Sequence, residues 1–127
     1  MNRVLVPLDG SPESESAIAA AMPLIRAVPS EITILRVIEN PSEWDEALAY
    51  LRKAASALRG QGFRVMMGLR TGSPTEEIQI QAHQGADWIA MSTRRRSGLA
   101  RLLEGSVTEG ILRQTDLPLI LSRPGMP

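Results

Sequence analysis

Short apolar runs and longer amphipathic segments alternate along the chain. Several of the short runs are continuous, as at residues 32–35, instead of alternating with polar residues. Strands that are buried on both faces have this pattern. Strands that alternate with helices predict an α/β domain, a doubly wound, Rossmann-like parallel sheet with helices on both faces. The five predicted strands lie at residues 3–8, 31–38, 63–69, 87–91 and 118–122.

The clearest predicted helix lies between the second and third strands. Its apolar residues recur at helical spacing and its charged residues mostly occupy the other side, as in a helix with one buried face. Gly60 and Gly62 predict its end. The residues expected on the buried face are Trp44, Ala47, Leu48, Leu51, Ala55 and Leu58.

Two further helix starts are marked by a serine that precedes a proline. In Ser11-Pro12 and Ser73-Pro74, we expect the hydroxyl to cap the helix and the proline to occupy its first position. Ser73 and Glu76 also have the spacing of a capping box. The last helix is expected to begin near Ser106, with Val107, Ile111 and Leu112 facing inward.

Composition narrows the classes of protein. The chain has 127 residues, 43% hydrophobic and 22% charged, which predicts one domain spanning residues 1–127. Lys plus Arg equals Asp plus Glu at 14 each, so no overall field draws the protein to nucleic acid or to an anionic membrane. The absence of cysteine excludes disulfides, thiolate metal sites and a thiol nucleophile.

The chain shows no targeting or membrane signal. Its first residues lack the pattern of a signal peptide. No apolar run approaches the roughly 20 residues that a membrane-spanning helix needs. We therefore expect a cytoplasmic protein that does not span a membrane.

The first candidate for chemistry is the turn after the first strand. In a doubly wound sheet, ligands bind outside the carboxyl ends of the strands, where the strand order reverses. The turn there reads Asp9-Gly10-Ser11-Pro12, with a glycine that permits an unusual backbone angle. Asp9 can stabilise this turn, orient a ribose or contact a metal. One carboxylate does not make a metal site, so no metal centre is predicted.

The second candidate is the connection after the fourth strand, residues 92–106. It is longer than an ordinary strand-to-helix connection, contains four arginines, and precedes the predicted helix start at Gly105-Ser106. Backbone N–H groups and the helix dipole at such a start favour an anion. Arg94, Arg95 and Arg96 can form a solvated basic edge or contact a phosphate. Their position favours a phosphate site.

These blocks together resemble the universal stress protein family. Residues 4–11 are similar to its first strand and Asp-Gly-Ser turn, and residues 87–94 to its acidic residue, apolar strand and Gly-Thr-Arg. Residues 91–107 keep the spacing of its Gly-x-x-Gly, nine residues and Gly-Ser motif. The resemblance covers the whole chain. It implies the strand order 3-2-1-4-5, a stress-response role and a homodimer, often paired through the last strand.

The resemblance also implies a ligand, ATP, with Mg²⁺ brought by the nucleotide. Another adenine nucleotide or simple phosphate stays open. Two family glycines are replaced here by Ser92 and Arg95, and the Arg95 guanidinium is able to grip a phosphate. By position, the residues near adenosine would be Pro7, Leu8, Asp9 and Val37, and those along the ribose and phosphates would be Met91, Gly105, Ser106 and Val107.

Other classes of protein fit the sequence less well. The only lysine, Lys53, lies on the amphipathic helix, which excludes a P-loop. No nucleophile elbow surrounds Ser11, and His83 is expected on the surface at the end of the third helix. We expect no enzyme, with slow ATP hydrolysis left open. Two functions remain: a nucleotide-sensing module, or a ligand-independent dimeric interaction protein in which Ser92 and Arg95 mark a lost ATP site.

Overall fold

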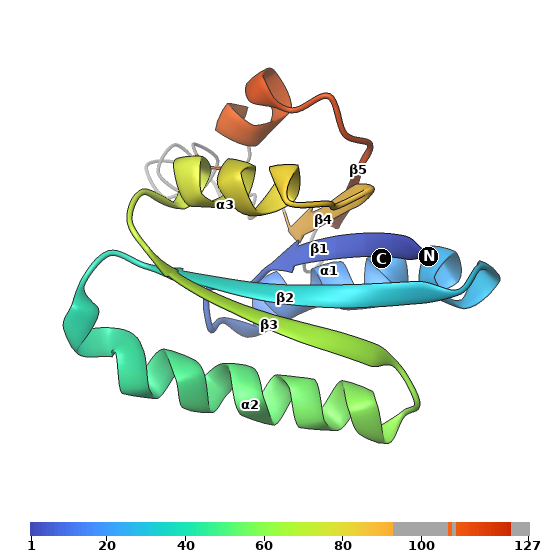
Figure 1. The fold of residues 1–127 in the computed structure, drawn as a ribbon, viewed down its shortest axis with the longest axis horizontal. Coiled ribbons are helices and arrows are strands. Elements are labelled where there is room, and N and C mark those ends of the chain that lie inside the picture. Colours follow the sequence, from blue (N-terminus) through green and yellow to red (C-terminus); the bar gives the residue numbers. More distant parts are fainter. Residues whose placement is uncertain (93–106, 108, 123–127) are drawn as a thin grey trace.

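A five-stranded parallel sheet forms the centre of the molecule (Figure 1). The computed structural model describes residues 1–92, 107 and 109–122. The strands lie in the order β3-β2-β1-β4-β5, and all paired neighbours are parallel. This confirms the predicted fold class and strand order. The strands are β1 (Asn2–Pro7), β2 (Ser30–Ile38), β3 (Arg64–Thr71), β4 (Trp88–Ser92) and β5 (Leu119–Ser122).

Helices cover both faces of the sheet. On one face, α1 (Pro12–Ala27) packs on β1, β4 and β5, and α2 (Trp44–Gly60) packs on β2 and β3. A short 3-10 helix (Pro41–Glu43) leads into α2. On the other face lie α3 (Pro74–His83) and the last helix, in which residues 107 and 109–114 are helical (Figure 1). No helix in the described ranges is both long and apolar enough to cross a bilayer.

The two predicted serine caps have different outcomes. The Ser11 hydroxyl caps α1 as predicted. Ser73 does occupy the N-cap position of α3, but its side chain makes no capping hydrogen bond, so the predicted capping box with Glu76 is wrong. The first turn of α3 is instead anchored to the sheet, because Glu77 forms an ion pair of 2.8 Å with Arg70 of β3.

Two apolar clusters form the core, one on each face of the sheet. Both draw fully buried residues from the strands, which explains why the strand sequences read as continuous apolar runs. The first cluster, on the side of α1 and α2, includes Val4, Val6, Leu8, Ile32, Ile34 and Leu51. The second cluster, on the side of α3 and the last helix, includes Leu5, Leu35, Ile78, Ile89, Met91 and Ile111.

Two residues that were predicted to face inward are exposed. Trp44 is 44% exposed because it is the first residue of α2, ahead of the buried stripe that begins at Ala47. Leu112 is 50% exposed, whereas its neighbour Ile111 is fully buried. Adjacent helical residues point about 100° apart, so both cannot face the sheet. Of the rest of the predicted stripe on α2, Ala47, Leu51, Ala55 and Leu58 are buried, whereas Leu48 is only half-buried.

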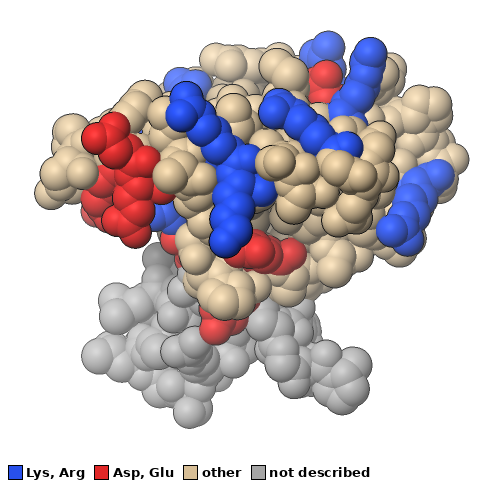
Figure 2. Space-filling view, turned by 90° about the horizontal axis from the view of Figure 1, so that it is seen from below, with Lys and Arg blue, Asp and Glu red and all other residues tan. Residues whose placement is uncertain are grey.

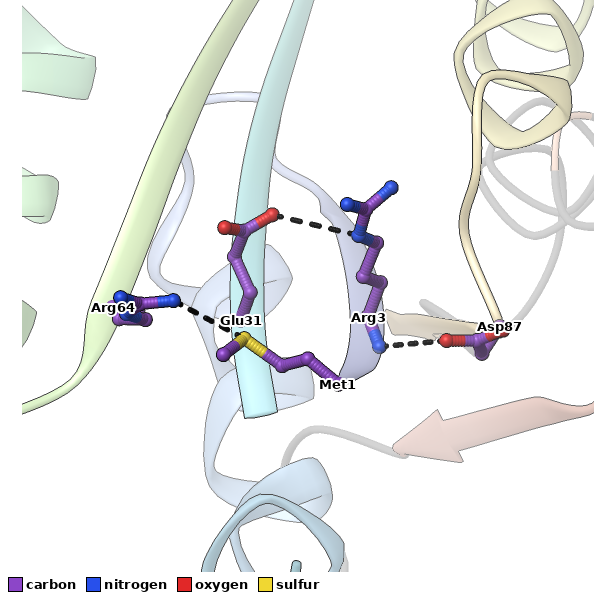
Figure 3. Close-up of polar contacts among 5 residues, drawn as sticks. All are labelled: Met1, Arg3, Glu31, Arg64 and Asp87. Carbon is purple, nitrogen blue, oxygen red and sulfur yellow. Dashed lines mark hydrogen bonds and ion pairs between the residues drawn. The ribbon is translucent and has the colours of Figure 1, made fainter. Parts of the chain in front are cut away.

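Polar contacts tie β1 to the chain around it at the amino end of the sheet (Figure 3). The backbone N–H of Arg3 donates to Asp87 Oδ2 over 2.9 Å, and the backbone N–H of Asp87 donates to the Arg3 carbonyl over 2.8 Å. Arg3 Nε lies 3.9 Å from Glu31 Oε1 on β2, and Arg64 Nη1 donates to Met1 Sδ. These polar residues therefore contribute to register at the end of the sheet opposite the predicted site.

The face of the molecule on the side of α2 carries charges of both signs (Figure 2). Acidic Asp45 and Glu46 lie in the first turn of α2 and basic Arg59 lies in its last turn. Arg52 and Lys53, between them, are exposed. This order complements the helix dipole, which gives the charges of α2 a structural role.

Candidate functional site

The carboxyl ends of β1 and β4 form the switch point of the sheet. The chain leaves β1 for α1 on one face and leaves β4 toward the last helix on the other face. In such folds a ligand binds between the two connections. Leu5 pairs with Ile89, which puts Pro7 and Met91, each two residues further on, at the same level. The predicted residues of both strands therefore meet at this point.

Asp9 lies in a turn that its own side chain stabilises. Asp9 Oδ1 accepts hydrogen bonds from the backbone N–H and the hydroxyl of Ser11, over 2.9 and 2.5 Å. The backbone N–H of Asp9 donates to Ser14 Oγ over 3.2 Å. Gly10 has φ of +91°, which side-chain-bearing residues rarely adopt. Asp9 is exposed, so the turn holds its carboxylate at the rim of the switch point.

Three of the predicted residues lie together on the side of α3. Val37, Met91 and Val107 all belong to or pack against the second apolar cluster. Val37 and Val107 are half-buried, and Met91 is 6% exposed. We call these three residues the apolar wall. A partly exposed apolar surface beside a few polar groups is typical of small-molecule sites.

The other predicted residues contribute differently. Pro7 and Ser92 are half-buried at the last positions of β1 and β4. The Leu8 side chain is 3% exposed and packs in the first cluster, on the opposite face from the apolar wall, so any ligand contact from Leu8 would come from its backbone. Its N–H donates to the Leu35 carbonyl. Arg95, Gly105 and Ser106 lie outside the described residues.

Sequence reasoning missed a cluster of side chains beneath the Asp9 turn. The Arg36 guanidinium lies over the Tyr50 ring, with 5.6 Å between its carbon and the ring centroid, within the range of a cation–π contact. Tyr50 Oη donates to Glu15 Oε2 over 2.8 Å. Burial, and then this hydrogen bond, raise the pKa of Tyr50 well above its ordinary value of 10.0. The sequence did contain one sign of this cluster: Arg36 lies two residues after Ile34, so it occupies the same face of the strand as a buried apolar residue.

Other polar groups of the described ranges lie away from the switch point. His83 is exposed at the end of α3, as predicted. No three His, Cys, Asp or Glu residues of the described chain are grouped so as to hold a metal ion. Two hollows, of about 360 and 530 Å³, lie toward the amino ends of the strands, away from the switch point; Arg3, Glu31, Gln81 and Gln84 line the first, and Arg26, Phe63 and Arg64 line the second.

The sheet order and the switch-point site define a doubly wound α/β domain. The sequence profile of the universal stress protein family matches residues 1–123, and the chain belongs to this family. Universal stress protein MJ0531 of Methanocaldococcus jannaschii is 26% identical over 140 residues, which cover 96% of this chain and 82% of the relative. Universal stress protein YxiE of Bacillus subtilis is 26% identical over 96% of this chain and 99% of its own length.

Solved structures share the whole fold. Protein MJ0577 superposes with a TM-score of 0.84 at 24% identity, over 99% of this chain and 98% of its own. A universal stress protein in complex with cAMP has a TM-score of 0.80 at 22% identity, over 96% of both chains. A universal stress protein of Archaeoglobus fulgidus in complex with dAMP has a TM-score of 0.72 at 19% identity, over 95% of this chain and 96% of its own.

Proposed function

We propose that this protein is a stress-response module that binds an adenine nucleotide, with ATP as the first candidate, at the carboxyl ends of β1, β2 and β4. The observation that carries the proposal is the apolar wall of Val37, Met91 and Val107 beside the switch point. The wall would contact the adenosine. Asp9, held exposed by its turn, would accept a hydrogen bond from a ribose hydroxyl.

Related structures support an adenine ligand. Universal stress proteins of the same fold have been solved with cAMP and with dAMP. In this chain the phosphates would lie at Gly105-Ser106, since a helix start favours an anion, with Arg95 as a further contact. Mg²⁺ would arrive with the nucleotide. Bound nucleotide would then change how ordered the binding loop is, or the oligomeric state of the protein, and this change would act as the signal.

We expect binding without rapid turnover. Phosphoryl transfer requires a positioned base or water-orienting group in addition to charge stabilisation. In the described part of the site, Asp9 is the acidic candidate, and its Oδ1 already accepts two hydrogen bonds from Ser11. Phosphate release from ATP should therefore be slow. Release at the rates of ordinary kinases, roughly 1–100 s⁻¹, would contradict this expectation.

Calorimetric titration tests the proposed ligand. ATP with Mg²⁺, AMP, cAMP and inorganic phosphate would be titrated into the purified protein, and we expect ATP to bind in the micromolar range. Val37→Trp should weaken binding at least tenfold because the indole fills space along the apolar wall. Val28→Trp is the matched control, since Val28 is 43% exposed and follows the end of α1, away from the switch point. Ser106→Trp should abolish binding of phosphorylated ligands.

Absence of heat at millimolar ATP would overturn the sensor function. The alternative, a ligand-independent interaction protein, would then stand, and Ser92 at a family glycine position favours it. Equal losses in Val37→Trp and Val28→Trp would instead show that the apolar wall is not the site.

We further propose a homodimer paired through β5. This strand lies at one edge of the sheet, and its Leu121 is 41% exposed. An edge strand with apolar side chains gains from being covered. Sedimentation equilibrium should give a dimer for the native chain and a monomer for Leu121→Lys. A native chain that stays monomeric at about 100 times the concentration used for binding would refute this assembly.

A further inference from the structure

Arg36 is a charged residue on a face of β2 that otherwise packs into the core. Ile32 and Ile34, four and two residues before it, are fully buried in the first apolar cluster. The Arg36 Nε–H is itself buried and has no hydrogen-bond acceptor within the described chain. A buried donor without a partner destabilises a fold, so an apolar side chain would suit this position better. Stability therefore does not explain why position 36 carries an arginine.

The end of the Arg36 side chain contacts the turn that carries Asp9. A Cβ atom on Gly10 would lie 2.5 Å from Arg36 Nη1 and 3.3 Å from its Cζ. The guanidinium is thus packed directly against the backbone of Gly10, at the φ of +91° that the turn requires. A larger residue at position 10 would displace it. The two residues form one close contact beneath the turn.

The other side of the guanidinium is fixed by α2 and α1. The Tyr50 ring lies 5.6 Å from Arg36 Cζ, and the Tyr50 hydroxyl is anchored to Glu15 on α1. Glu15 lies in the first turn of α1, directly after the turn that carries Asp9 and Gly10. Three elements, β2, α2 and α1, therefore meet at one guanidinium that supports Gly10.

We propose that Arg36 is a positioning residue of the nucleotide site: stacked on Tyr50, its guanidinium holds the Asp9-Gly10 turn so that the Asp9 carboxylate meets the ligand. This inference rests on the proposed adenine-nucleotide function. Arg36 acts through the turn and does not itself contact the nucleotide, since its side chain lies on the face of α1 and α2 and the apolar wall lies on the other.

The test compares Arg36→Met with Arg52→Met, a matched change at an exposed arginine of α2. Methionine keeps the apolar stem without the unsatisfied Nε–H. We expect Arg36→Met to keep or raise the Tm, to weaken AMP binding about tenfold, and to speed hydrogen exchange at the Ser11 N–H, which donates to Asp9. Arg52→Met should change none of the three. Tyr50→Leu should repeat the effect by removing the stacked ring, and Arg36→Lys should recover only part of the affinity.

The outcomes separate this inference from the proposed function. Unchanged AMP affinity and unchanged Ser11 exchange in Arg36→Met would overturn it. A large loss of Tm with exchange raised throughout the chain would also overturn it, because Arg36 would then be an ordinary structural residue. If the native protein binds neither AMP nor ATP, the proposed function fails, and Ser11 exchange alone still decides whether Arg36 holds the turn.

Discussion

Gly110 lies in the last helix, and one neighbouring methyl group decides whether Gly110→Ala raises or lowers the free energy of unfolding. A Cβ atom at residue 110 would lie 2.8 Å from Thr75 Cγ2 and 3.2 Å from Thr75 Oγ1 on α3. This is roughly 0.7 Å short of an ordinary carbon–carbon contact. The two helices therefore pack closely here, and Gly110→Ala must move one of them or rotate Thr75.

Two opposing contributions determine how much Gly110→Ala changes the free energy of unfolding. Alanine is favoured over glycine in a helix interior by about 1 kcal/mol. Overpacking at a well-packed contact costs about 1–3 kcal/mol. We expect Gly110→Ala to lower the free energy of unfolding by about 0–2 kcal/mol in the native background. In a Thr75→Ser background the clashing methyl is gone, and the same change should raise stability by up to about 1 kcal/mol.

Urea unfolding followed by circular dichroism would measure all four proteins of this cycle. In a domain of this size, 1 kcal/mol corresponds to about 4 °C in Tm, so thermal scans provide a second measure. Thr75→Ser alone is the control for loss of the methyl group. If Gly110→Ala stabilised both backgrounds equally, the close contact between Gly110 and Thr75 would not exist in solution.

Three other predictions follow from contacts in the described chain. Leu51→Ala, at a fully buried site, should cost about 2–5 kcal/mol in urea unfolding; a loss below 1 kcal/mol would mean that α2 does not pack on the sheet. Ser11→Ala removes the cap on Ser14 N–H and the hydroxyl donor to Asp9 and should cost about 1–2 kcal/mol, whereas Ser11→Thr, which keeps the hydroxyl, should cost less. Tyr50 is the only tyrosine, so absorbance at alkaline pH reports it alone: its ionisation should begin above the ordinary range, and Glu15→Gln should bring it closer to that range. Because the folded state holds this proton more tightly than the unfolded chain, the stabilisation from Tyr50 is present below about pH 10 and is lost as the pH rises further; an ordinary titration near pH 10 would refute the Tyr50–Glu15 contact.

The fold was predictable because its central strands are buried on both faces. Such strands appear as continuous apolar runs with helical segments between them, and all five strands begin and end within two residues of the prediction. The third strand was predicted to end at residue 69 but extends through Arg70 to Thr71. Its last residues are polar because β3 is an edge strand, and the apolar pattern therefore stops before the hydrogen bonding does.

The site was predictable only where its chemistry is local. The Asp9 turn is specified by neighbours in sequence, and its hydrogen bonds run between residues 9, 11 and 14. The role of Arg36 depends on its contacts with Gly10 and Tyr50. These residues lie on other elements, and no sequence spacing relates them to Arg36. Trp44 shows the same limit for burial, since helical spacing places a residue on a stripe but does not say where the sheet beneath ends.

The central position of β1 sets an order of assembly. β1 pairs with β2, only 28 residues away at Asn2 and Ser30, whereas its contact with the β4 region joins Arg3 to Asp87, 84 residues away. At synthesis rates of about 5–20 residues per second, β4 leaves the ribosome roughly 4–17 s after β1. During that interval the first three strands can form a sheet while β1 presents an open edge. The switch point, which needs both β1 and β4, is therefore among the last parts of the molecule to be completed as the chain is made.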